Sequence, residues 1–336
     1  KTSKLATFLT GLCTISCGGD YESNAILDVK DVVSTDILNL EAAALAIQSN
    51  APAADADGWN STDDADAVNA MRADWHDARV AYERIEGAIA VLFPDLDAST
   101  DERYDGFIGE ADDNDLFDGE GVTGVHAIER ILWADSHSDT VVAFESSLSG
   151  YTEAAFPANE AEADAFANEL VQRFVDDAAL MGSEFEPLAL DAAAAYEGVV
   201  GSMAEQVEKI TLAYTGEAES RYAGHTLADM VANLEGGLAI YSAFSEWIIA
   251  EGGEAEDTAV LDGFARVLET YNAFSGNALP AVPATWNPDS PTDDDLATDY
   301  GIIWSMLDTE SNPDAEGSLV SAMVEAAAII GIEVAL

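Results

Sequence analysis

The chain of 336 residues contains four histidines, and one of them, His126, lies three residues before a glutamate, Glu129. Positions i and i+3 of a helix project from one face, so an imidazole and a carboxylate at this spacing can bind one cation together. The same spacing is also found in solvated pairs and in pairs within a protein core. Taken alone, this pair leaves both interpretations open.

Two further acidic residues, Glu83 and Glu86, repeat this spacing in the segment 75–86. Trp75 and Tyr82 supply apolar anchors in the same segment, so we expect a helix that carries the two carboxylates on one face. An exposed acidic face is the alternative. Two arginines of the segment could instead form neutralising salt bridges with the glutamates.

A polar stripe follows farther along the chain, where His225, Asp229 and Asn233 step by four residues. On a helix, these side chains share one face while the other faces are apolar. A buried polar stripe must be satisfied either by hydrogen bonds in the core or by a ligand. The stripe is predicted to support the fold or the site rather than to bind an ion directly.

Together, these segments resemble the imelysin family, and within it the Efe-type iron-uptake branch. The first two matching blocks are Trp-x-x-Ala-Arg-x-x-Tyr-x-x-Ile-Glu from Trp75 and Phe-Pro-Asp-Leu-Asp from Phe93 with Asp101. They are followed by Gly-x-His-x-x-Glu from Gly124 and His-Thr-Leu-x-Asp-x-x-Ala-Asn-x-x-Gly from His225. The resemblance covers roughly residues 28–336. The stretch between Lys209 and Tyr222 is longer than in the iron-uptake branch.

The resemblance implies a protein that is exported, folds as helical bundles and takes part in the acquisition of iron or another metal. It also implies that His126 and Glu129 belong to a metal site, joined by Glu83, Glu86 and Asp101. Iron(III) prefers oxygen ligands and accepts imidazole, so this ligand set suits iron, with copper, zinc or calcium as alternatives. The expected partners are the metal ion and a membrane iron permease.

Two other functions compete with metal capture. Imelysins have been grouped with metallopeptidases, but no two histidines here lie four residues apart, as the His-Glu-x-x-His pattern of many zinc peptidases requires. We therefore expect a protein that is not an enzyme. A structural or adhesive surface protein is the other alternative, and it would leave the co-occurrence of the motif blocks unexplained.

The elements that must position these residues are predicted to be helices, because apolar residues recur at three- and four-residue steps without sustained alternation. The fold class is therefore all-α, with two helical-bundle halves at residues 28–153 and 154–336. An acidic stretch at 95–121 is predicted to be a loop that faces the site. The predicted helices are Asp28–Gln48, Thr62–Leu92, Gly124–Trp133, Glu160–Met181, Pro187–Tyr214, Thr226–Ala250, Asp257–Phe274, Thr292–Leu307 and Glu316–Leu336.

The first 17 residues have the pattern of a lipoprotein signal peptide. Lys1 and Lys4 precede an apolar stretch, which ends in a small residue before Cys17. We expect Cys17 to be lipidated and residues 18–27 to form a flexible tether. The domain would then lie outside the cell membrane or in the periplasm, in contact with the membrane through this anchor alone. An ordinary apolar helix at the terminus is the alternative.

The composition excludes nucleic acid as a partner. There are 65 Asp and Glu against 12 Lys and Arg, which gives a formal net charge of −53 at pH 7. Binding to a phosphate backbone requires clustered basic residues, which this chain lacks. Because 49% of the residues are hydrophobic and periodic, we expect a folded protein rather than a disordered one. Salt would screen the self-repulsion, as in proteins of halophiles.

Overall fold

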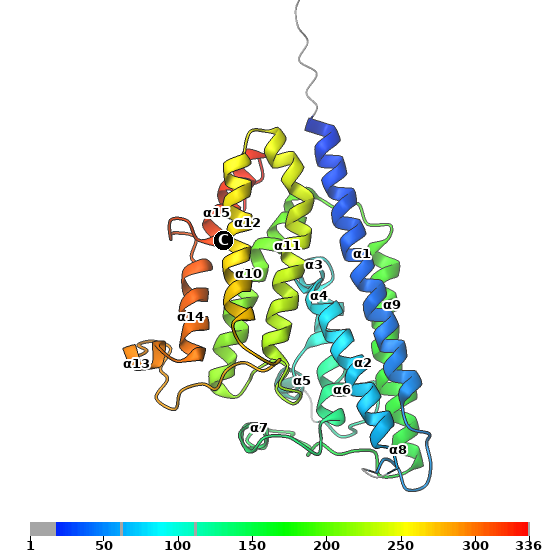
Figure 1. Ribbon diagram of the computed structural model, residues 1–336. Coiled ribbons are helices and arrows are strands. Elements are labelled where there is room, and N and C mark those ends of the chain that lie inside the picture. Colours follow the sequence, from blue (N-terminus) through cyan, green and yellow to red (C-terminus); the bar gives the residue numbers. More distant parts are fainter. Residues whose placement is uncertain (1–17, 61–62, 111–112, 335–336) are drawn as a thin grey trace, which may run out of the picture.

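The computed structural model describes residues 18–60, 63–110 and 113–334. The predicted signal peptide and Cys17 lie outside these described residues. Every regular element in the described part is a helix, so the predicted all-α class is confirmed (Figure 1). The longer helices are α1 (Gly18–Asn50), α2 (Ala65–Glu83), α9 (Val171–Phe185), α10 (Ala192–Thr215), α11 (Thr226–Ala250), α12 (Glu254–Asn272), α14 (Asp299–Glu310) and α15 (Leu319–Ile329).

Shorter helices connect them or cap the ends of the molecule. They are α3 (Glu86–Leu92), α4 (Pro94–Asp101), α5 (Tyr104–Glu110), α6 (Gly124–Leu132), α7 (Asp139–Glu145), α8 (Glu160–Ala165) and α13 (Asp293–Leu296). A π-helical turn, η1 (Phe166–Leu170), joins α8 to α9. No described helix is both long enough and apolar enough to cross a membrane.

The helices pack in two groups that meet along α11 (Figure 1). Helices α1, α2, α6 and α9 form one group, whereas α10, α11, α12, α14 and α15 form the other. Helix α11 also packs against α1 and α2, and the buried apolar residues of both groups form one continuous core. Helix α9, which follows residue 153 in the sequence, packs with the first group. The division into two domains at residue 153 stays a prediction.

Helix α1 begins ten residues earlier than the predicted start at Asp28, so residues 18–27 continue the helix where a flexible tether was expected. Its buried face follows the helical period, because its apolar side chains recur at steps of three or four residues. These residues are Val29, Val33, Ile37, Leu40, Ala44 and Ile47. This stripe explains why the helix packs against α2, α9 and α11 along its length.

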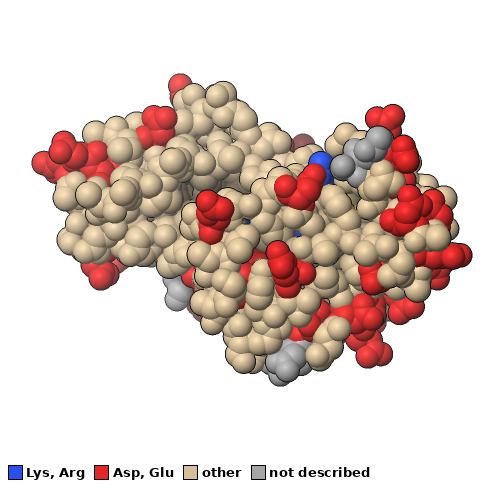
Figure 2. Space-filling model, turned by 90° about the horizontal axis from the view of Figure 1, so that it is seen from below, with Lys and Arg blue, Asp and Glu red and all other residues tan. Residues whose placement is uncertain are grey.

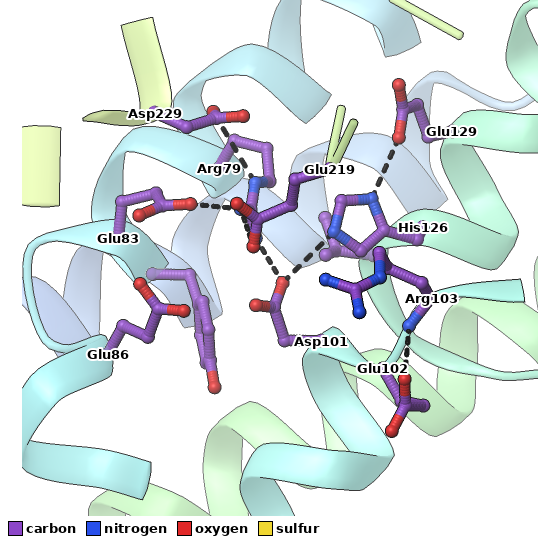
Figure 3. Close-up of polar contacts among 12 residues, drawn as sticks. Arg79, Glu83, Glu86, Asp101, Glu102, Arg103, His126, Glu129, Glu219 and Asp229 are labelled. Carbon is purple, nitrogen blue, oxygen red and sulfur yellow. Dashed lines mark hydrogen bonds and ion pairs between the residues drawn. The ribbon is translucent and has the colours of Figure 1, made fainter. Parts of the chain in front are cut away.

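The predicted helix at 62–92 is divided at Arg84 and Ile85 into α2 and α3. The division coincides with a close approach of α11, whose Gly236 packs directly on the backbone of Arg84. A Cβ atom on Gly236 would lie 2.1 Å from the carbonyl oxygen of Arg84. The break allows Glu83 at the end of α2 and Glu86 at the start of α3 to face the same interior region (Figure 3).

The prediction of a loop at 95–121 was wrong for its first half, which contains α4 and α5. Pro94 stands at the first position of α4, where its missing N–H costs nothing, and Asp95 and Asp97 stabilise the positive end of the helix dipole. Helix α4 packs against α6 and α9 and ends at Asp101. A short helix therefore delivers this acidic residue to the site.

Candidate metal centre

All of the residues that were predicted to form the site lie in one polar cluster where the two groups of helices meet (Figure 3). Helices α2, α3, α4, α6 and α11 contribute to it, and the turn between α10 and α11 adds residues that the sequence analysis did not single out. The contacts within the cluster divide it into an imidazole end around His126 and a cationic end around Arg79 and Lys209.

At the imidazole end, His126 is 1% exposed and its Nδ1 lies 2.8 Å from Oε2 of Glu129. The other ring nitrogen, Nε2, has no hydrogen-bond partner and faces Oδ1 of Asp101 at 3.4 Å. Burial, and secondarily the charge of Arg79, lower the pKa of His126 well below its usual value. The imidazole is therefore neutral, which is the form that binds metal ions.

Glu129 positions this imidazole. Its second oxygen, Oε1, accepts the backbone N–H groups of Tyr222 and Ala223 at 3.0 and 2.8 Å. Burial raises the pKa of Glu129 well above its usual range, against the hydrogen bond from the backbone of Ala223. In its ionised form Glu129 can only accept hydrogen bonds, and Nδ1 of His126 then carries the proton, which leaves the lone pair on Nε2. Such carboxylate–histidine pairs fix the ring orientation in metal sites. Glu129 thus contacts the imidazole and the turn after α10, rather than the space in front of Nε2.

Glu219, in that turn, was not predicted as a site residue. One oxygen each from Asp101 and Glu219 and one nitrogen of His126 lie within 4.8 Å of one another, which is a spacing that one metal ion can bridge. Burial opposes the ionisation of Glu219, but Lys209 and Arg79 outweigh it and hold the pKa of Glu219 well below its usual range. Burial raises the pKa of Asp101 well above its usual range, against the opposing charge of Arg79.

At the cationic end, the fully buried guanidinium of Arg79 is surrounded by four carboxylates (Figure 3). It pairs with Glu83 and Asp101, and lies 3.1 Å from Glu219 and 3.5 Å from Asp229. A buried carboxylate without a partner is costly, so this cation stabilises the cluster. The salt bridges considered from the sequence are therefore present for Arg79.

Lys209 of α10 is the second buried cation. Its Nζ lies 3.0 Å from Glu83, 3.0 Å from Glu86 and 2.7 Å from Glu219. Glu86 also accepts a hydrogen bond from Asn233, which was predicted in the polar stripe of α11. Glu83 and Glu86, proposed from the sequence as metal-site residues, thus have protein cations as partners in this structure.

The remaining members of the polar stripe on α11 also make contacts within the protein. Nδ1 of His225 lies 2.8 Å from Asp229, and Asp229 faces Arg79. The ring of His225 packs against that of His76, with centroids 4.4 Å apart and planes tilted by 31°. The stripe therefore contacts the charged members of the cluster, and its supporting role stays a prediction.

A pocket of about 200 Å³ leads to this cluster, and its walls are strongly acidic. Burial, and secondarily the charge of Glu86, raise the pKa of Glu205 to about 7, and burial raises the pKa of Asp97 to about 6. Such a pocket attracts cations and repels anions. The residues that line it are Glu86, Asp97, Ala98, Asp101, Glu102, Arg103, Glu205, Glu208, Lys209 and Glu219.

Comparison with known proteins identifies the family. A family model described as Imelysin, also named Peptidase M75, matches residues 31–286, which is more than half of the chain. The chain belongs to the imelysin family. Among curated proteins, this imelysin is 28% identical over 174 residues to the iron uptake system component EfeM of Bacillus subtilis (strain 168). That match covers 52% of this chain and 35% of EfeM, so the chain spans about a third of the length of that relative.

Proposed function

We propose that this imelysin binds one iron ion through Asp101, His126 and Glu219. The observation that carries the proposal is the buried Nε2 of His126, which has no hydrogen-bond partner and lies 3.4 Å from Asp101, a residue that lines the acidic pocket. An unpaired buried nitrogen is costly unless a ligand satisfies it. Two carboxylates and one imidazole suit iron(II) or iron(III), with water completing the coordination.

Family membership supports the choice of iron, because the curated relative is named as a component of an iron uptake system. We propose accordingly that this protein captures iron outside the cytoplasm and delivers it to a membrane permease. Copper, zinc and calcium are the competing ions. The pocket walls would concentrate any of them, but the imidazole favours a transition metal over calcium.

Titration of the purified protein with iron(II) under anaerobic conditions tests the site. We expect saturation at one equivalent, and a loss of at least about tenfold in affinity in each of His126→Ala, Asp101→Asn and Glu219→Gln. Glu208→Gln, at the exposed pocket wall, is the matched control and should change the affinity less than threefold. Weak binding that is shared with calcium and unaffected by these substitutions would contradict the proposal and favour a structural surface protein.

The anchor is proposed from residues 1–17 and is tested separately. In a bacterium that processes lipoproteins, the chain should incorporate a labelled fatty acid and fractionate with membranes. Cys17→Ala should abolish both. Equal labelling of the variant would contradict lipidation at this residue.

Peptidase activity is the second candidate, because the matching family model carries that name. The geometry favours ion binding instead. His76 and His225 pack against each other with their rings tilted by 31°, and His225 pairs with Asp229 rather than with His126. Incubation of the metal-loaded protein with unfolded casein should therefore leave the substrate intact.

A further inference from the structure

Arg79 occupies the centre of a second group of potential metal ligands. Oxygens of Glu83, Glu219 and Asp229 lie within 4.8 Å of one another, and all three side chains face the guanidinium (Figure 3). Glu219 is also a member of the group that contains His126. The two groups therefore share one carboxylate.

Lys209 also pairs with two members of this group, at 3.0 Å from Glu83 and 2.7 Å from Glu219, but the guanidinium and this ammonium together leave part of the group unsatisfied. Oε2 of Glu83 and Oδ2 of Asp229 have no hydrogen-bond partner, although both side chains are 0% exposed. Nε of Arg79 lies 3.5 Å from Asp229 and makes no hydrogen bond either. A planar guanidinium has its donors in a fixed fork, so it cannot reach every lone pair of three converging carboxylates. A metal ion, which draws ligands from all directions, fits such a group better.

We propose that the group formed by Glu83, Glu219 and Asp229 is a second cation position, which the guanidinium of Arg79 occupies in place of a metal ion. The wild-type protein then binds one ion, and Arg79 sets that stoichiometry. Removal of the guanidinium admits a second ion, and Glu219 bridges the two. This inference rests on the proposed function for the first ion.

Arg79 also affects the first ion, because it pairs with Asp101 through Oδ1, the oxygen that faces His126. A metal ion at His126 must share this oxygen with the guanidinium, and the two cations repel each other. Removal of Arg79 should therefore increase the affinity of the first position by at least tenfold. Arg79 limits both the number of ions bound and the strength with which the first is held.

The test uses manganese(II), a cation that accepts oxygen and imidazole ligands and has a strong electron paramagnetic resonance signal. Arg79→Met keeps the aliphatic stem and removes the charge, and Arg79→Lys is the control that keeps the charge. We expect one equivalent of manganese in the wild type and in Arg79→Lys, and two in Arg79→Met. Bridged ions about 3.5–4 Å apart would give a spin-coupled spectrum. Arg79→Met combined with Glu83→Gln and Asp229→Asn should return to one uncoupled ion.

One equivalent of uncoupled manganese in folded Arg79→Met, bound as in the wild type, would overturn the inference. The variant will be less stable without metal, so circular dichroism is measured with and without manganese. Refolding that requires manganese and gives two coupled ions supports the inference, whereas a variant that no manganese concentration refolds overturns it. Failure of the proposed function can be told apart from failure of this inference. If His126 does not bind the first ion, His126→Ala in the Arg79→Met background leaves manganese binding unchanged.

Discussion

At the scale of single residues, the site separates the tasks of binding and of positioning within one short motif. Nε2 of His126 has no hydrogen-bond partner and faces Asp101, whereas Glu129 uses both oxygens to hold the ring and the backbone of the turn after α10. The His-x-x-Glu spacing therefore serves the orientation of one ligand. The other two proposed ligands, Asp101 and Glu219, come from other elements.

Glu129→Gln tests this division of tasks. Glutamine keeps the shape but has one accepting oxygen where glutamate has two, so it cannot accept from both Nδ1 of His126 and the backbone of the turn, and we expect the affinity for iron(II) to fall by about 10–100-fold. His126→Ala should lose the ion altogether. Isothermal titration under anaerobic conditions measures both variants, and thermal unfolding confirms that they are folded. An affinity equal to that of the wild type would contradict the positioning role of Glu129.

The half-buried Glu205 makes stability depend on pH. Burial, and secondarily the charge of Glu86, raise its pKa to about 7 in the folded state, from about 4.5 in the unfolded chain. The folded state therefore binds the extra proton, and this contribution to stability is full below about pH 4.5 and lost as pH rises through about 7.

Glu205→Gln should consequently be more stable than the wild type at pH 8, by roughly 1–3 kcal/mol after allowance for solvent screening. The two proteins should be equally stable at pH 4. Urea unfolding at fixed ionic strength and several pH values measures the difference. A difference that stays constant with pH would show that Glu205 does not titrate in this range.

At the scale of elements, the close approach of α11 to the junction of α2 and α3 places the carboxylates of one group opposite the polar stripe of the other. Gly236 ends the motif that begins at His225, and its position against the backbone of Arg84 explains why a glycine stands there. An added methyl group would push α11 away from a backbone that cannot yield.

Gly236→Ala should therefore destabilise the protein by about 2–4 kcal/mol, as overpacked core substitutions do at the upper end. Gly201→Ala is the matched control, because Gly201 lies in α10 with open space around the position of its Cβ. That change should stabilise the helix by about 0.5–1 kcal/mol. Equal effects of the two substitutions in denaturant unfolding would contradict the close packing.

The helices and the His126 motif could be predicted because the recurrence of apolar residues every three or four positions indicates a helix and its buried face. The break at Arg84 depends on α11, far away in the sequence, so the local pattern of 62–92 could not reveal it. Glu219 lies in a turn without helical period, and only the folded chain brings it to His126. Arg79 was suspected of forming salt bridges, but its four carboxylate partners come from α2, α4, α11 and the turn.

At the scale of the whole molecule, the few cations are placed where burial makes them most effective. Lys209, Arg79, Arg130 and Arg221 are buried beside carboxylates, so few cations remain to offset the acidic side chains of the surface. Figure 2 shows acidic side chains spread over one face, with little Lys or Arg exposed. Attraction between buried opposite charges is thus combined with repulsion between the exposed carboxylates of the surface.

Salt should therefore raise the thermal stability strongly. The Debye length falls from about 10 Å at 0.1 M to about 3 Å at 1 M, so surface repulsion is screened while the buried pairs are little affected. We expect the unfolding midpoint to rise by at least about 5 °C between 0.1 and 2 M sodium chloride, equally in potassium chloride. Combined substitution of the exposed Glu246, Glu269 and Glu325 by glutamine should reduce this dependence, because it removes repelling charges without touching the site. If His126→Ala reduced the dependence of the unfolding midpoint on salt as much as the three surface substitutions do, the salt effect would arise from occupation of the metal site rather than from screening of the surface.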